Sequence, residues 1–134
     1  MEDVRWKQRL DNLTRAVKIF EECIDSVKKM PEDNLYQIAL IGSFSFCFEL
    51  SWKTLKDYLS YSGVQVYLPR EVIKQAFQFN LIDDGQLWID MLEDRNIMAH
   101  VYDETRADEA AKSIQSRYYK GIKQVFDQLQ SKLL

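Results

Sequence analysis

Residues 35–48 read LYQIALIGSFSFCF, a run that is apolar on nearly every side of the helix it would form. A helix of this kind must be buried on more than one side. It is therefore expected either at the centre of a helical bundle or against a second subunit. Gly42, Ser43 and Ser45 are small enough to let another helix approach closely. The whole predicted helix covers residues 34–62, and Gly63 fits its C-terminal stop.

Helices are predicted on both sides of this segment. Residues 3–29 carry an apolar stripe at alternating spacings of four and three, which is one face of a helix. A short helix is predicted at 69–79, with Phe77 among its inward residues. Another is predicted at 85–100 after Asp83 and Asp84, and a last one from about 105 to the end. The class is therefore all-α. We expect an antiparallel four-helix bundle with a short extra crossover helix, five helices in a single domain spanning residues 1–134.

The composition is that of a soluble intracellular protein. Hydrophobic residues make up 46% and charged residues 29%, which is ordinary for a globular domain. The start lacks the apolar segment of a secretory signal, and residues 35–50 are too short and too often interrupted to span a bilayer. Cys23 and Cys47 lie inside helical patterns and are expected to be reduced core thiols. We expect a cytoplasmic location and no membrane contact.

Most enzyme signatures are missing from the sequence. There is no Gly-rich phosphate loop, no Cys/His cluster and only one histidine, so neither a metal nor a cofactor is expected. The net charge of −3 argues against a broad field for nucleic acid. From Arg95 onward, seven Lys/Arg against five Asp/Glu give +2, which leaves −5 for the remainder. This asymmetry permits a local anion site without requiring one.

One arginine stands where the helix over residues 85–100 needs an apolar side chain. A buried guanidinium without a partner is very costly, so Arg95 requires an ionic partner, an aqueous cleft or a function. Glu49, the charge that ends the apolar run, has two interpretations: a residue at the rim, or the partner of a buried cation such as Arg95. The helical face in question has a 3,4,3,4 spacing and comprises Trp88, Met91, Arg95, Met98 and Tyr102.

His100 follows Arg95 by five residues. An imidazole can transfer protons and a guanidinium can hold a phosphate, which suffices for metal-free RNA cleavage by the 2′-hydroxyl. Residues five apart on a helix point about 140° apart. The two side chains therefore converge only if the helix ends near His100, or if a two-fold dimer supplies a second copy. Asn96 shares the face of His100, and Tyr102 that of Arg95. The alternative is that His100 is a helix-capping or core residue.

Several longer motifs accompany this pair. They are FELSWKTLK at 48–56, PREV at 69–72, DGQLW at 84–88 and MLEDRN at 91–96, which runs into Arg-x4-His-x-Tyr. Together they resemble the HEPN superfamily, specifically the HepT-like proteins that are also called nucleotidyltransferase substrate-binding proteins. The resemblance extends over all five predicted helices.

The resemblance implies a helical bundle that forms a homodimer with the motif at the subunit cleft. It implies a metal-independent RNase that is the toxin of a toxin–antitoxin pair. The implied antitoxin is a minimal nucleotidyltransferase that silences the toxin by transferring AMP to the motif tyrosine. On this resemblance Arg95 and His100 are catalytic, Asn96 supports the site and Tyr102 accepts AMP. Glu49 is added as a supporting residue because it is the candidate partner of Arg95.

Three functions stay open on the sequence alone. The first is the RNase. The second is a non-catalytic nucleotide- or substrate-binding subunit of a two-component nucleotidyltransferase, with Arg95 gripping phosphate and Tyr102 stacking on or receiving a nucleotide. The third is a structural helical adaptor, in which residues 34–62 supply the interface and His100 is a cap.

Overall fold

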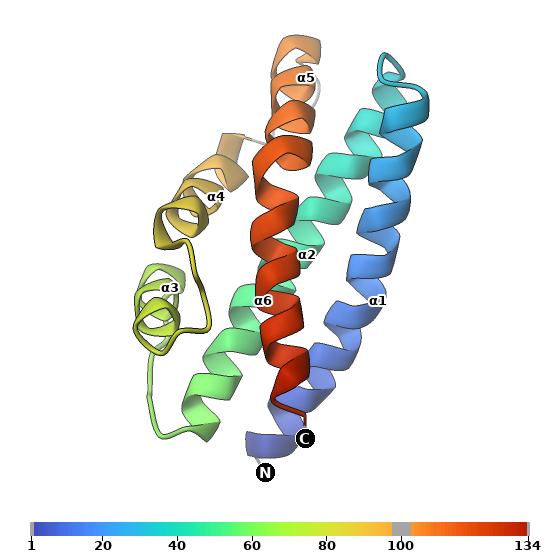
Figure 1. Ribbon diagram of the computed structural model, residues 1–134. Helices are drawn as coiled ribbons and strands as arrows, with labels where there is room; N and C mark the ends of the chain where they lie inside the picture. The colour runs from blue at the N-terminus through green and yellow to red at the C-terminus, as the bar shows by residue number, and fades with distance from the viewer. Residues whose placement is uncertain (1, 98–102, 134) are drawn as a thin grey trace.

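A computed structural model describes the backbone of residues 2–97 and 103–133, and the side chains of residues 4–95 and 103–133. Within these ranges the chain is helical and contains no strand. α5, η1 and α6 follow one another without interruption and form one rod (Figure 1). The predicted bundle of five helices is therefore confirmed. The elements are α1 (Glu2–Lys29), α2 (Asn34–Tyr61), α3 (Pro69–Gln78), α4 (Gly85–Ile97), α5 (Glu104–Ser113), the π-helix η1 (Ile114–Tyr118) and α6 (Tyr119–Ser131).

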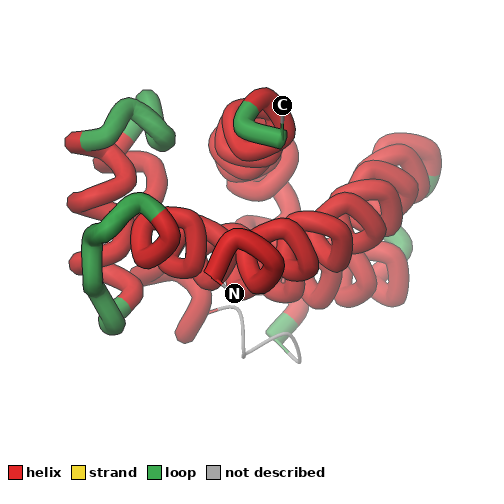
Figure 2. The backbone as a smooth tube through the Cα atoms, turned by 90° about the horizontal axis from the view of Figure 1, so that it is seen from below, coloured by secondary structure: helices red, strands yellow, loops and turns green. Residues whose placement is uncertain are grey.

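The two longest helices, α1 and α2, pack against each other along their length and run in opposite directions (Figure 1). The α5–η1–α6 rod lies against one side of this pair and is seen end-on in Figure 2. α3 and α4 form the crossover between α2 and the rod, and α3 contacts both α2 and α4. α1 begins and α6 ends at the same end of the bundle.

Local chemistry sets the helix ends. The Asp33 side chain accepts hydrogen bonds from the N–H groups of Leu35 and Tyr36 and caps α2. Asp103 caps α5 in the same way. Gly63 has φ +92° after α2, a left-handed conformation that favours glycine, and the Val64 N–H returns to the Leu59 carbonyl at 2.8 Å.

α2 is buried on more than one side, as its composition predicted. Phe44 stacks on Tyr118 of the rod, with ring centroids 5.5 Å apart. Phe48 stacks on Trp88 of α4 at 5.8 Å. All members of the predicted α1 stripe are buried against this core: Trp6, Leu10, Leu13, Val17, Phe20, Ile24 and Val27.

Both cysteines are free; Cys47 is buried and Cys23 is only partly buried. Burial raises the pKa of the Cys47 thiol to about 12. No described helix combines the length and the apolar character that a bilayer crossing requires.

The structure differs from the sequence-based expectation in two places. The last helix contains a π-helical turn, which its periodicity did not indicate. Phe77, expected to point inward, is half exposed because only Val72, Ile73 and Ala76 of α3 reach the core. Of the helix predicted over 85–100, residues 98–100 lie outside the described part of the chain.

Candidate functional site

Arg95 continues the buried face of α4 and has an ionic partner. Trp88 and Met91, two turns and one turn earlier on the same face, are fully buried. The Arg95 Nη1 donates a hydrogen bond to Glu49 Oε1 of α2 at 2.9 Å. The Arg95 side chain is 33% exposed and that of Glu49 is 39% exposed. The arginine therefore has both a carboxylate partner and access to solvent, which explains how the apolar stripe tolerates it.

The Glu49 carboxylate has a second donor. The indole Nε1 of Trp52, one turn later on α2, donates to Glu49 Oε2 at 2.9 Å. Trp52 is largely buried, so its ring is held by the core. Of the two interpretations of Glu49, the partner of Arg95 is observed, and its exposure also places it near the rim. The carboxylate is bonded at both oxygens.

Other side chains attach α4 to the remaining helices. The Tyr118 hydroxyl donates to the Asp94 carboxylate, and Arg117 Nη2 donates to Asp90 Oδ2 at 2.7 Å. Tyr118 and Arg117 are consecutive residues of the π-helical turn η1, and both bond to α4. These bonds restrict the position of the helix that carries Arg95.

These contacts shift two pKa values. Hydrogen bonds from Arg117 and Gln86 lower the pKa of the Asp90 carboxyl. Burial, with the neighbouring Asp94 carboxylate, raises the pKa of the Tyr118 hydroxyl well above its usual range. The lowered pKa favours the ionised Asp90 carboxylate and the raised pKa favours the protonated Tyr118 hydroxyl. These are the states in which the two contacts form.

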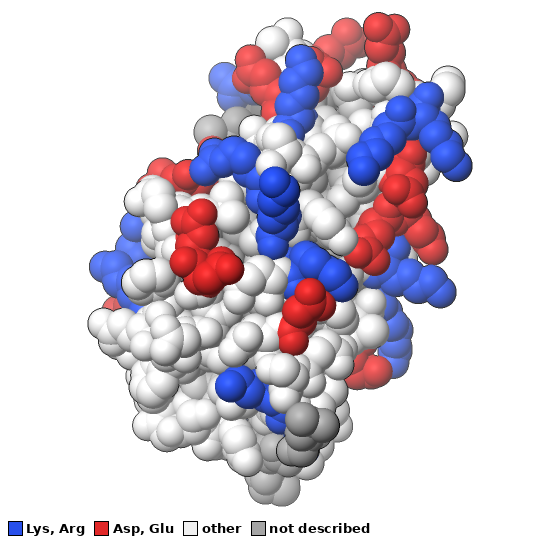
Figure 3. Space-filling view, in the orientation of Figure 1, with Lys and Arg blue, Asp and Glu red and all other residues white. Residues whose placement is uncertain are grey.

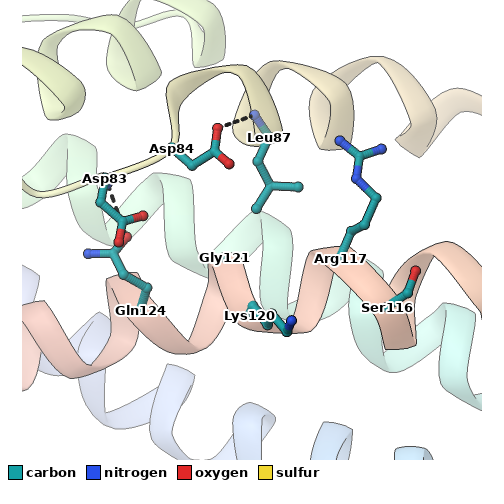
Figure 4. Close-up of a pocket in the computed structure, with 8 residues that line it drawn as sticks. All are labelled: Asp83, Asp84, Leu87, Ser116, Arg117, Lys120, Gly121 and Gln124. Atoms are coloured by element: carbon teal, nitrogen blue, oxygen red, sulfur yellow. Dashed lines mark hydrogen bonds between the residues drawn. The ribbon is translucent and has the colours of Figure 1, made fainter.

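A polar pocket of about 310 Å³ lies between the start of α4 and the η1–α6 rod. Arg117 reaches toward α4 beside it, and the Asp83 N–H donates to Gln124 Oε1 at 3.3 Å (Figure 4). Two acidic and two basic residues line the pocket, so its charges balance and it does not favour an anion. The lining residues are Asp83, Asp84, Leu87, Ser116, Arg117, Lys120, Gly121 and Gln124.

The charges on the rod are mixed as well. Figure 3 shows lysine and arginine side chains along α5 and α6, with acidic side chains between them. Lys112 pairs with Asp108 at 3.1 Å, and Lys123 pairs with Asp127 at 3.2 Å. This face therefore has no broad field of one sign among the residues that the structure describes, in keeping with the net charge.

An apolar groove of about 540 Å³ runs between α1 and α2. Phe46 stands beside it with 71% of its surface exposed, and Ile19 is 56% exposed. A Cβ placed on Gly42 would meet nothing within 4 Å, so no helix of the described chain uses the close approach that this glycine permits. The groove is lined by Ala16, Ile19, Cys23, Ala39, Gly42, Ser43, Phe46 and Leu50.

The structure brings together Arg95 and Glu49 among the predicted site residues. The backbone of Asn96 belongs to α4, but its side chain lies outside the described part, as do His100 and Tyr102. Among residues whose side chains are described, no group of three or more His, Cys, Asp or Glu is arranged to hold a metal ion.

Residues 8–131 match the family model described as nucleotidyltransferase substrate binding protein like. The chain belongs to this family. The match spans nearly the whole bundle and confirms the resemblance drawn from the motifs.

One curated relative is 32% identical over 72 residues, half of this chain and 49% of its own length. It is the Haemophilus influenzae protein named "Probable ribonuclease HepT". The aligned part thus spans about half the length of that relative.

Two solved structures share the fold of this family member. HI0074 from Haemophilus influenzae has a TM-score of 0.81 at 23% identity, covering 90% of this chain and 98% of its own. Its structure was described as the fold of a substrate-binding domain of a nucleotidyltransferase. A Thermus thermophilus protein has a TM-score of 0.67 at 25% identity, covering 83% of this chain and 98% of its own.

The sequence did not point to all residues around Arg95. The contact of Trp52 with Glu49 had a local signal, because residues three apart are neighbours on a helix. The bonds from Tyr118 and Arg117 had none, because they connect η1 to a helix more than twenty residues away. Such contacts follow from tertiary packing.

Replacing Tyr118 by Phe should lower the free energy of unfolding by about 1–2 kcal/mol at pH 7, because it removes a hydrogen bond to a carboxylate. The pKa of the hydroxyl is raised in the folded state. Its contribution is therefore complete below the unfolded value of about 10 and is lost as the pH rises further. Urea unfolding at pH 7 and pH 11 should show the difference between wild type and variant shrinking.

The matched control is Tyr67→Phe, since Tyr67 is 68% exposed. It should leave stability unchanged at pH 7. A Tyr118→Phe effect that is equally large at pH 7 and pH 11 would show that the ionisable hydroxyl is not its cause.

Proposed function

We propose that this chain is a metal-independent endoribonuclease that acts in the cytoplasm from a cleft between two copies, with Arg95 and His100 as its catalytic residues. The observation that carries the proposal is the state of Arg95. One of its nitrogens is bonded to Glu49, while a third of the side chain faces solvent. A guanidinium in this state offers further N–H donors in a fixed plane, which suits a phosphate of the RNA backbone.

The proposed reaction needs only a base, an acid and a cation. The 2′-hydroxyl loses its proton to the base and its oxygen attacks the neighbouring phosphorus. The bond from phosphorus to the 5′-oxygen breaks, and that oxygen takes a proton from the acid. A 2′,3′-cyclic phosphate and a 5′-hydroxyl result. His100 of one copy and its equivalent in the second serve as base and acid, and Arg95 stabilises the charge on the phosphorane.

The apolar groove supports a two-fold dimer. Phe46 and the groove lie on the same face of α1 and α2, so two copies related by a two-fold axis each place a Phe46 in the groove of the other. Glu49 follows Phe46 by three residues, about 60° around α2. This contact would therefore bring the Glu49–Arg95 pairs of both copies to the edge of the interface. Asn96 supports the site beside them.

The proposed partner is a minimal nucleotidyltransferase that acts as the antitoxin. It transfers AMP to the Tyr102 hydroxyl and releases pyrophosphate from ATP. Tyr102 shares the helical stripe of Arg95 in the sequence pattern, so the attached phosphate would lie near the guanidinium and compete with RNA. Family membership supports the partnership, because the family is described as nucleotidyltransferase substrate binding protein like. A minimal nucleotidyltransferase gene next to this one is the corresponding genetic expectation.

The same family description favours a second candidate function, a non-catalytic nucleotide-binding subunit of a two-component nucleotidyltransferase. In that role Arg95 grips the phosphate of a nucleotide and no RNA is cleaved. Nucleotide affinity without cleavage distinguishes this candidate from the RNase.

Purified protein should cleave RNA in the presence of EDTA and leave a cyclic phosphate end. Arg95→Ala and His100→Ala should each lower the cleavage rate by about 100-fold or more, because each removes a group used in the transition state. Arg70→Ala is the matched control, since Arg70 also pairs with a carboxylate of α4, Glu93, at 3.6 Å. Cleavage that persists undiminished in His100→Ala would assign the activity to a contaminant.

Tyr102→Phe should cleave RNA like wild type and escape silencing when the partner nucleotidyltransferase and ATP are added. Mass spectrometry should find one added AMP on wild type and on the Tyr67→Phe control, but none on Tyr102→Phe. Equal silencing of the Tyr102→Phe variant would refute the role of this hydroxyl.

Phe46→Glu should shift the protein from dimer to monomer, because it places a carboxylate in an apolar groove. Light scattering after size exclusion measures the mass. RNA cleavage should be lost together with the dimer. Leu68→Glu, at a residue 62% exposed on the α2–α3 connector, should remain dimeric and active. If the Phe46→Glu protein is still a dimer, the interface does not include the apolar groove.

A further inference from the structure

We propose that Trp52 is a positioning residue that fixes the direction of Arg95 through Glu49 without touching the substrate. The kinetic part of this inference rests on the proposed RNase function, whereas the geometry does not. The chain of contacts is short: Trp52 Nε1 to Glu49 Oε2 at 2.9 Å, then Glu49 Oε1 to Arg95 Nη1 at 2.9 Å. One carboxylate thus connects a buried indole to a partly exposed guanidinium.

The need for a second contact follows from exposure. Glu49 and Arg95 are both more than 30% exposed, and an ion pair in that setting is weak and fluctuates among geometries. A glutamate bonded only to an arginine can rotate about its side-chain bonds and carry the guanidinium with it. A donor on the other oxygen restricts the plane of the carboxylate, and therefore the direction in which Arg95 presents its remaining N–H groups.

Trp52 is suited to this task. It is 8% exposed and belongs to the core cluster, so its indole has little freedom. Its single N–H cannot turn to another acceptor without moving the ring. It lies three residues after Glu49 on α2, so the helix itself sets their spacing. The packed core therefore restricts the indole, the indole restricts the carboxylate, and the carboxylate restricts the arginine.

Trp88 provides a natural comparison. It is also buried, at 0% exposure, but its indole nitrogen has no hydrogen-bond partner among the described residues. Replacement of either tryptophan by phenylalanine removes an indole N–H and a similar volume. Only the Trp52 replacement removes a contact to the Glu49 carboxylate. Trp88→Phe is therefore the matched control for a packing effect.

A double-mutant cycle on RNA cleavage tests the inference. Trp52→Phe should lower kcat about 3- to 10-fold with little change in KM, because misdirection of a transition-state donor affects the chemical step. Glu49→Ala should lower kcat at least as much. Adding Trp52→Phe to Glu49→Ala should have no further effect, because the tryptophan acts only through the carboxylate. Trp88→Phe should keep the kcat of wild type in protein that is verified as folded.

Independent effects of Trp52→Phe and Glu49→Ala would overturn the inference, as would an unchanged kcat in Trp52→Phe. A general loss of structure would instead lower kcat by the same factor whether Trp52→Phe is made in wild type or in the Glu49→Ala variant. The cycle therefore separates positioning from packing.

A second measurement needs no activity. The chain has three tryptophans, so a ¹⁵N–¹H spectrum shows three indole N–H resonances. Arg95→Ala should move the Trp52 indole resonance, because the change reaches it through the shared carboxylate, and should leave that of Trp6 in place. Wild type that fails to cleave RNA while this shift occurs would reject the RNase and retain the coupling. A Trp52 resonance that keeps its position in both Arg95→Ala and Glu49→Gln would reject the coupling of Trp52 to Arg95 through Glu49.

Discussion

The ion pair between Glu49 and Arg95 connects α2 to α4 and gives the cation on the buried face of α4 its partner. α4 buries Trp88 and Met91 and then places a permanent cation on the same face. A helix tolerates that pattern when the cation keeps access to solvent and the neighbouring element supplies a negative charge beside it. α2 supplies it at Glu49, where its apolar run ends. The ion pair thus accompanies the packing of α4 against α2 and leaves a partly exposed guanidinium at the surface.

The polar contacts around α4 define its position more than they add to its stability. The helix has thirteen residues, and its charged side chains are distributed over three neighbours. Asp90 and Asp94 bond to η1, Glu93 pairs with Arg70 of α3, and Arg95 bonds to α2. The exposed ion pairs among these contacts contribute little free energy each, but together with the Tyr118–Asp94 hydrogen bond they define one orientation. The π-helical turn belongs to this arrangement, because it presents Arg117 and Tyr118 to the same helix.

The sequence predicted the helices and their buried faces because these depend on periodicity and on capping residues close in the chain. The α1 stripe, the start of α4 after Asp83 and Asp84 and the glycine stop at Gly63 are all of this kind. Glu49 kept two interpretations, a residue at the rim or the partner of Arg95, because its charge was visible in the sequence but the packing of α2 on α4 was not. The π-turn and the Tyr118–Asp94 bond could not be predicted, because each depends on how the rod packs.

Helix geometry and an exposed apolar surface both support the proposed second subunit. Arg95 and His100 are five residues apart, which is about 140° on a continuous helix, so on such a helix they would converge only with the help of a second copy. The same protomer exposes Phe46 beside an apolar groove, one turn of α2 before Glu49. A monomer would leave this phenylalanine and the groove in water, at an unfavourable cost that burial of apolar surface removes. α2 carries both Phe46 and the partner of Arg95, and its apolar first half is more extensive than the core of one protomer requires.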